Sequence, residues 1–203
     1  MTCVTTTRRS ATRALAGALL GMLTAMPLAG PAHAQDVPGS QDHAFLSRMP
    51  FAWIAHYSQE ESGTYELVLS ALPSDDAGPE DAERRQKLEG RVTRIQYRID
   101  SGQTSSNVYH QYGYAISRGE LETLVERKGP PTRAPGGSVF LRRVFAPLGE
   151  DAVDALVTTV APQQRRFYAG RQVRADGKET YLVLVVNQLT DKEVRVQADI
   201  IEP

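Results

Sequence analysis

The chain has 203 residues, a formal net charge of −1 and one cysteine, Cys3. This near-neutral balance argues against a nucleic-acid binder, which needs a basic surface to contact phosphates, and against a polybasic membrane-surface protein. One cysteine cannot form a disulfide within the chain or hold an iron–sulfur cluster, so the stability of the fold must come from its core.

The first 34 residues have the three parts of a secretory signal peptide. A basic head with three arginines is followed by an apolar run, Ala14–Leu28, and then by Ala32-His33-Ala34, a small-x-small cleavage pattern. The run is about 15 residues long, shorter than the roughly 20 that a membrane-spanning helix needs. We expect cleavage after Ala34 and export; an uncleaved N-terminal anchor helix is the alternative.

Cleavage there leaves residues 35–203, about 169 residues, which is enough for a single domain with its own core. The leader carries three of the 23 basic residues and none of the 24 acidic residues, so the mature chain has a net charge near −4 and no cysteine. It contains no further run of about 20 apolar residues, so we expect no membrane span in it.

The mature chain is predicted to begin with a short helical segment and a β-hairpin. Asp42 is placed to cap a helical turn over His43–Met49. Alternation of apolar and polar residues then predicts strands over residues 51–59 and 64–72, joined by a hairpin turn at Glu60–Gly63.

A strand–helix–strand unit is predicted after a polar surface loop at residues 73–87. The strands span residues 88–100 and 121–127, and Thr104 or Ser105 can cap the helix between them. This order suits a right-handed crossover connection, which would make the two strands parallel.

The C-terminal part predicts a second helix, residues 150–160, and a three-stranded meander with strands at 166–174, 181–186 and 194–200. The middle strand is apolar on both faces, as expected inside a sheet. Residues 129–145 hold a loop rich in Gly and Pro and a stretch that fits a helix or a strand. In the last strand three polar residues alternate with apolar ones and are expected to face water: Arg195, Gln197 and Asp199. Together these elements predict an α+β domain with a mainly antiparallel sheet.

Catalytic and metal-binding motifs are absent from the sequence. The three histidines of the mature chain lie in separate elements, and none has a histidine or carboxylate at a ligand spacing such as HExxH, so we predict no metal and no cofactor. The adjacent Asp42 and His43 could form a base and its orienting carboxylate. A polar turn at the N-terminus of the domain is the alternative.

Aromatic residues in the predicted helix suggest a binding surface. Tyr109 and Tyr112 are three residues apart and could form one ledge of a groove for a sugar or a peptide; the alternative is that Tyr112 belongs to the core. Arg166, beside two aromatic residues, could make cation–π or anion contacts, although a strand entering a sheet edge explains it equally well. The candidate binding residues are Asp42, His43, Tyr109, Tyr112 and Arg166.

The segment DVPGSQDHAFLSRMP, residues 36–50, resembles the opening of a family of exported bacterial proteins, the domain of unknown function DUF4892. Members often begin, just after their signal, with a D-V-x-G-S-x-D-H-x-x-L-x-R-x-P type segment, and Glu89–Tyr97 and Arg165–Ala169 are also similar. One position departs from the pattern, because Phe51 stands where a glycine is expected. Many relatives carry an OmpA-like peptidoglycan-binding domain after this one. We expect it to be missing here, so peptidoglycan binding is not carried over.

The resemblance implies a Gram-negative periplasm or outer-membrane periphery, and it implies no catalytic residues. We therefore expect a non-catalytic periplasmic module that binds an envelope protein or a cell-wall component. Two alternatives stay open. One is an enzyme acting on an envelope glycan or peptide through Asp42 and His43, and the other is a small-ligand carrier with its cavity between sheet and helices.

Overall fold

The computed structural model describes Met1 and residues 35–69, 85–118, 121–128, 141–142 and 144–203. The predicted leader lies outside the described residues, as do most of the loop predicted at 73–87 and all of the loop predicted at 129–137. Residues 85–87, placed in the first of these loops by the sequence, belong instead to a strand.

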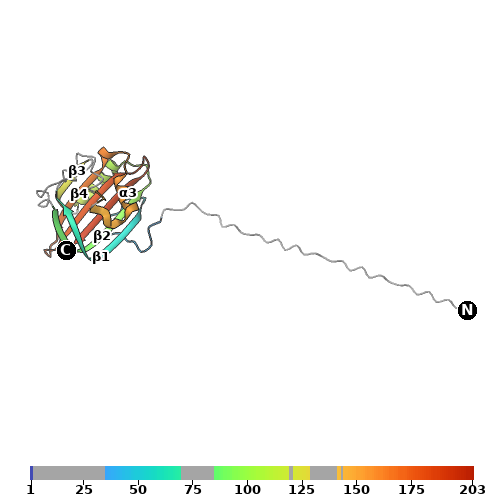
Figure 1. Cartoon of the computed structure of the whole chain (residues 1–203), viewed down its shortest axis with the longest axis horizontal. Coiled ribbons are helices and arrows are strands. Elements are labelled where there is room, and N and C mark those ends of the chain that lie inside the picture. The colour runs from blue at the N-terminus through green and yellow to red at the C-terminus, as the bar shows by residue number, and fades with distance from the viewer. Residues whose placement is uncertain (2–34, 70–84, 119–120, 129–140, 143) are drawn as a thin grey trace. The chain divides into compact units, whose positions relative to one another are not determined.

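Six strands of the described residues form one antiparallel sheet in the order β1-β2-β6-β5-β4-β3, with β1 and β3 at its edges (Figure 1). The strands are β1 (Ala52–Val68), β2 (Arg85–Ile99), β3 (Glu122–Lys128), β4 (Arg166–Val173), β5 (Glu179–Gln188) and β6 (Val194–Glu202). The α+β class and the C-terminal meander of β4, β5 and β6 are thus confirmed. As predicted, β5 is central and buried on both faces.

The predicted order of strand, helix and strand and the parallel direction of the two strands, β2 and β3, are also confirmed. The helix α1 (Ser105–Arg118) joins these two strands. Four successive antiparallel pairings connect them through β6, β5 and β4, so β2 and β3 point in the same direction although they are not neighbours. The Thr104 hydroxyl accepts a hydrogen bond from the Asn107 N–H at 3.2 Å, which makes Thr104 the N-terminal cap.

The hairpin turn predicted at Glu60–Gly63 is wrong. β1 continues through it and pairs with β2 from Ala52 opposite Ile99 to Val68 opposite Arg85, so the hairpin is formed by β1 and β2. The pairing register shifts between Glu60 and Gly63, as at a β-bulge. The polar residues there resemble a turn because they belong to an edge strand, where side chains can face water.

Helices cover both faces of the sheet. On one side, α1 packs on β4, β5 and β6; we refer to this side as the α1 face. On the other side, α3 (Glu150–Val157) packs on β5 and β6, and helical residues 141–142 and 144–145 join the same core; we refer to it as the α3 face. Figure 1 shows α3 lying against the strands. The stretch before residue 146, whose sequence fits either a helix or a strand, is therefore helical where the structure describes it.

The prediction that β6 has one wet face is wrong. Gln197 and Asp199 are fully buried and Arg195 is half-buried, because the α3 face covers the side of β6 that the alternating pattern assigned to water. Alternation of polar and apolar residues records which side chains share a face, and it does not distinguish water from a buried polar cluster.

Candidate functional site

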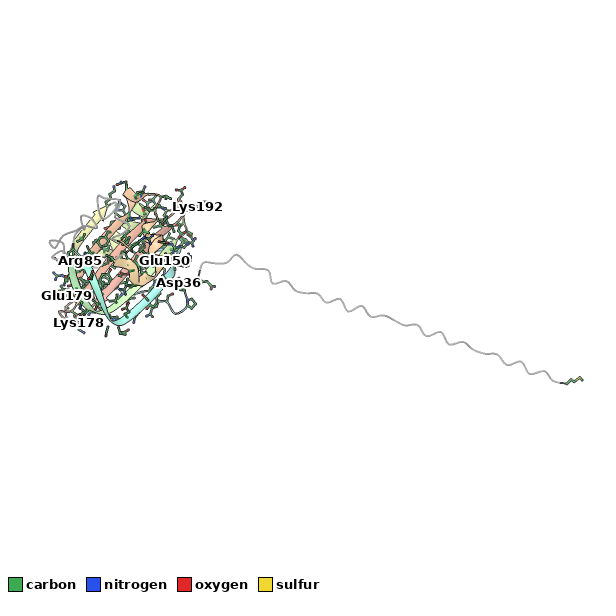
Figure 2. The ribbon with its side chains drawn as sticks, in the orientation of Figure 1. Asp36, Arg85, Glu150, Lys178, Glu179 and Lys192 are labelled. Atoms are coloured by element: carbon green, nitrogen blue, oxygen red, sulfur yellow. The ribbon has the colours of Figure 1, made fainter. Side chains whose placement is uncertain are left out.

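Residues 36–50, called the strap below, bind along the outer edge of β1. The Val37 N–H donates to the Ile54 carbonyl at 3.0 Å, and the Ile54 N–H donates to the Asp36 carboxylate at 2.7 Å. Figure 2 shows Asp36 beside β1. Since β1 is an edge strand, these bonds satisfy backbone groups that would otherwise be open to pairing with another chain.

Ionic contacts hold the strap in its path. Arg48 donates two hydrogen bonds to Asp36, at 2.9 and 2.7 Å, and one to Asp42 at 2.9 Å. The Arg48 guanidinium lowers the pKa of the Asp36 carboxyl through these bonds. Tyr97 of β2 donates its hydroxyl to Asp42 at 3.0 Å, which ties the strap to the sheet. The helical segment predicted over His43–Met49 is therefore wrong: residues 44–46 form a turn and a bend, the rest have no regular structure, and Asp42 pairs with an arginine instead of capping a helix.

Asp42 and His43 are neighbours in sequence but have different partners. His43 Nε2 lies 3.4 Å from a Glu202 carboxylate oxygen, which also accepts two hydrogen bonds from Arg91. His43 Nδ1 accepts the Phe45 N–H at 3.2 Å. The structure thus ties His43 to the end of β6 and Asp42 to Arg48, and it does not arrange the two side chains as a base and its orienting carboxylate.

Tyr109 and Arg166 do come together. The Arg166 guanidinium lies 5.9 Å from the centre of the Tyr109 ring, and the Tyr109 hydroxyl donates to Glu126 at 2.8 Å. Arg166 is buried, and its guanidinium donates to the carbonyls of Gln164 and Arg165 at 3.0 and 3.2 Å. These contacts dock β4 against α1.

A hollow of about 520 Å³ lies between the strap and α1, and we call it the strap groove. It is lined by Phe45, residues 47–50, Gln111, Tyr112, Tyr114 and Arg118. Of the five predicted site residues, Tyr112 lines the groove, and it is 1 % exposed. Asp42 supports the groove through Arg48, whereas His43, Tyr109 and Arg166 are not part of its lining.

Sequence reasoning identified only Tyr112 of this lining, and among the residues it missed are Tyr114 and Arg118. Tyr114 is 66 % exposed, and the Arg118 guanidinium lies 5.6 Å from the centre of its ring. The spacing of four residues places both side chains on one face of a helix, and that spacing in a tyrosine-rich helix was the available signal.

Among the described residues, the charged side chains that line the groove are all cationic. Its described lining holds two arginines and no carboxylate. Arg48 is engaged by Asp36 and Asp42, which lie outside the lining. Across the described residues, no carboxylate lies within ion-pair distance of Arg118.

The α3 face holds a second polar group, which we call the buried cluster: Tyr65, Arg94, Gln197 and Asp199. The Asp199 carboxylate accepts hydrogen bonds from the Tyr65 hydroxyl at 2.9 Å and the Gln197 amide at 2.6 Å. Arg94 Nε lies 3.9 Å from the same carboxylate, and Arg94 also donates to Glu60 at 2.8 Å. Burial raises the pKa of Asp199 to about 6 and raises the pKa of Tyr65 as well.

A hollow of about 380 Å³, the α3 hollow, lies next to this cluster at the start of α3, where Figure 2 labels Glu150. Its lining includes His56, Gln96 and Arg195. Gln96 donates to the Ala152 carbonyl at 2.9 Å and accepts from Arg195 at 3.2 Å. Burial, and then the nearby Arg94 charge, lower the pKa of His56. Gln96 and Arg195 satisfy one another, which favours a structural role for them, whereas the buried Nε2 of His56 has no hydrogen-bond partner among the described residues.

Comparison of the chain with protein-family models and with curated proteins finds no match. The resemblance to DUF4892 therefore stays a prediction. No helix in the described ranges is long and apolar enough to cross a membrane. Within the same ranges, no group of three or more His, Cys, Asp or Glu residues is arranged to hold a metal ion.

Proposed function

We propose that this protein is an exported, non-catalytic module that binds a component of the bacterial cell envelope in the strap groove. The observation that carries the proposal is the groove itself, a hollow that combines an exposed aromatic ring, apolar strap residues and an arginine, Arg118, that has no ion-pair partner among the residues the structure describes. A concave site lined by apolar side chains with a few polar groups is typical of ligand binding.

Binding is favoured over catalysis because the groups able to transfer protons are used elsewhere. Asp42 is held by Arg48 and Tyr97, and His43 is held by Glu202. Neither side chain lines the groove. A general base must be within hydrogen-bond reach of the proton that it removes, and these two residues do not meet that condition for a ligand in the groove.

The envelope enters the proposal through the sequence. The first 34 residues have the pattern of a cleavable export signal, and residues 36–50 resemble the opening of an exported family. The same residues 36–50 form the strap, which is one wall of the groove. The segment that suggests the compartment is therefore also the segment that builds the site.

The test is co-sedimentation of the protein without residues 1–34 with two isolated envelope fractions, cell-wall sacculi and outer-membrane vesicles. We expect the protein to sediment with one fraction, and we expect the double variant Tyr114→Ala, Arg118→Ala to stay in the supernatant. Arg174→Ala is the matched control, because Arg174 lies in the turn after β4 and does not line the groove. Sedimentation that is unchanged in the double variant, or absent in the unaltered protein, would contradict the proposal.

A further inference from the structure

We infer that the ligand of the strap groove is an acidic carbohydrate, whose sugar ring stacks on Tyr114 and whose carboxylate pairs with Arg118. This inference rests on the proposed binding function and names the chemical class of the ligand. Four properties of the groove support it: the charge of its lining, the exposed tyrosine ring, its neutral hydrogen-bonding groups and its position relative to the strand edges.

The charge of the lining selects an anion. Arg48 and Arg118 are the charged residues of the described lining. Arg48 is already paired with the carboxylates of Asp36 and Asp42, so it mainly forms a fixed part of the groove wall. Arg118 is exposed, and its planar guanidinium can donate two parallel hydrogen bonds to a carboxylate.

The ring of Tyr114 selects a ligand with a flat apolar face. An exposed tyrosine is ordinary by itself, but this one borders a hollow and has a guanidinium 5.6 Å from its ring centre. That cation–π contact helps to hold both side chains in place. The C–H face of a pyranose ring fits such an aromatic surface, and its carboxylate would then lie near Arg118.

Neutral hydrogen-bonding groups complete the site. The Ser47 hydroxyl is exposed at the groove, and Gln111 donates its amide N–H to Gln103 at 3.3 Å, which leaves the Gln111 carbonyl oxygen able to accept. Sugar hydroxyls both donate and accept hydrogen bonds, so they match this mixed pair. The volume of about 520 Å³ lies in the range of small-ligand sites.

The position of the groove argues against an extended peptide as the ligand. Such peptides commonly bind by adding a strand to an open sheet edge. The groove lies between the strap and α1, and the β1 edge at Ile54 is already bonded to the strap. A peptide in this groove would find no strand to pair with, whereas a sugar needs none.

The test is isothermal titration of the protein without residues 1–34 with two acidic probes, an oligogalacturonate and a disaccharide containing N-acetylmuramic acid. Each probe is compared with its own methyl ester, which keeps the rings and removes the charge. We expect at least one acid to bind, at least tenfold more tightly than its ester. Arg118→Gln should remove that preference for the acid, and Arg118→Lys should restore only part of it, because an ammonium lacks the planar fork.

Two further variants make the result specific. Tyr114→Ala should weaken binding of both acid and ester, whereas Arg174→Gln should change neither. Equal affinity for acid and ester, unchanged binding by Arg118→Gln, tighter binding of an Asp- and Glu-rich peptide, or no binding of either probe would overturn the inference. If these probes fail while envelope sedimentation still depends on Tyr114 and Arg118, the binding function survives and only the ligand class is wrong.

Discussion

Two groups of charged side chains, one on each face of the sheet, differ in their exposure to water. On the α1 face, Asp36, Arg48 and Asp42 pair at the rim, where each is partly exposed. On the α3 face, Arg94 is 3 % exposed and Asp199 is 0 % exposed, and both lie within the sheet under a cover of helices. The same kinds of side chain therefore lie partly in water in the first group and out of water in the second.

This difference in exposure indicates that the two groups of charges have different roles, one in binding and the other in stability. Charges at a rim keep most of their hydration, so their pairs contribute little to stability. Charges in the core depend on one another. Removing one partner leaves the other charge buried and unpaired, which lowers the free energy of unfolding by about 3–5 kcal/mol. The α1 face is thus suited to binding, while the buried cluster of the α3 face fixes how β1, β2 and β6 pack.

The largest effect should follow from Arg94→Met. The substitution leaves Asp199 buried without its cation and leaves Glu60 unpaired, so we expect the free energy of unfolding to fall by about 3–5 kcal/mol in urea titrations. Adding Asp199→Leu should recover most of the loss, because the carboxylate then no longer needs a partner. A double variant as unstable as the single one would show that Arg94 acts through packing and not through charge.

The next effect is a pH dependence that belongs to Asp199. Burial raises its pKa from 3.8 to about 6. Between these values the folded protein holds a proton that the unfolded chain has released. Its contribution to stability is therefore fully present below about pH 4 and is lost as the pH rises through 6. A shift of this size corresponds to at most about 3 kcal/mol.

Asp199→Asn isolates this contribution, since the groups with lowered pKa values, such as Asp36, act in the opposite direction in both proteins. Urea unfolding at several pH values should show the unaltered protein losing stability relative to the variant between pH 4 and pH 6. A difference that stays constant with pH, or grows as the pH rises, would contradict the raised pKa.

A smaller effect is expected from Arg48→Ala on the α1 face. It removes the bonds to Asp36 and Asp42, and because these are partly exposed we expect a loss of about 1–2 kcal/mol. The specific readout is hydrogen exchange at the Ile54 amide, which should speed up when Asp36 is released. Arg171→Ala breaks a comparable pair of contacts with Glu122 and Glu179 away from the strap, and it should leave Ile54 protected.

The smallest effect concerns Phe51, which is 85 % exposed and has a φ of +64°. A bulky residue in this left-handed region destabilises the fold by roughly 1–2 kcal/mol, whereas glycine adopts the same conformation without this strain. Phe51→Gly should therefore stabilise the protein by up to about 1 kcal/mol in thermal unfolding, after the greater freedom of glycine in the unfolded chain is included. Phe51→Ala keeps the Cβ and should give no such gain. Equal effects of the two variants would remove backbone strain as the explanation.

Sequence patterns correctly predicted those helices and strands whose structure depends mainly on residues close by in the chain. The helix beginning after Thr104 has its cap in the sequence, and the strands of the meander follow their alternation. The turn expected at Glu60–Gly63 failed because polar residues of an edge strand look like a turn. The wet face expected for β6 failed because α3, more than 30 residues earlier in the chain, covers it.

The site was harder to predict because distant contacts build it. The partners of Asp42 and His43 on the sheet, Tyr97 and Glu202, lie 55 and 159 residues along the chain. Nothing near either residue in sequence indicates those partners. Tyr112 was found from helical spacing, but the importance of Tyr114 and Arg118 depends on where the strap lies, which the contacts of Arg48 determine.

Binding of the ligand to the α1 face, and not to the α3 face, can be tested by NMR. Amide signals of the isotope-labelled protein without residues 1–34 would be followed during titration with the acidic oligosaccharide that binds in calorimetry. We predict that the shifts concentrate at residues 45–50 and 111–118, around the strap groove. Shifts centred instead on His56, Gln96 and residues 149–152, around the α3 hollow, would contradict the account.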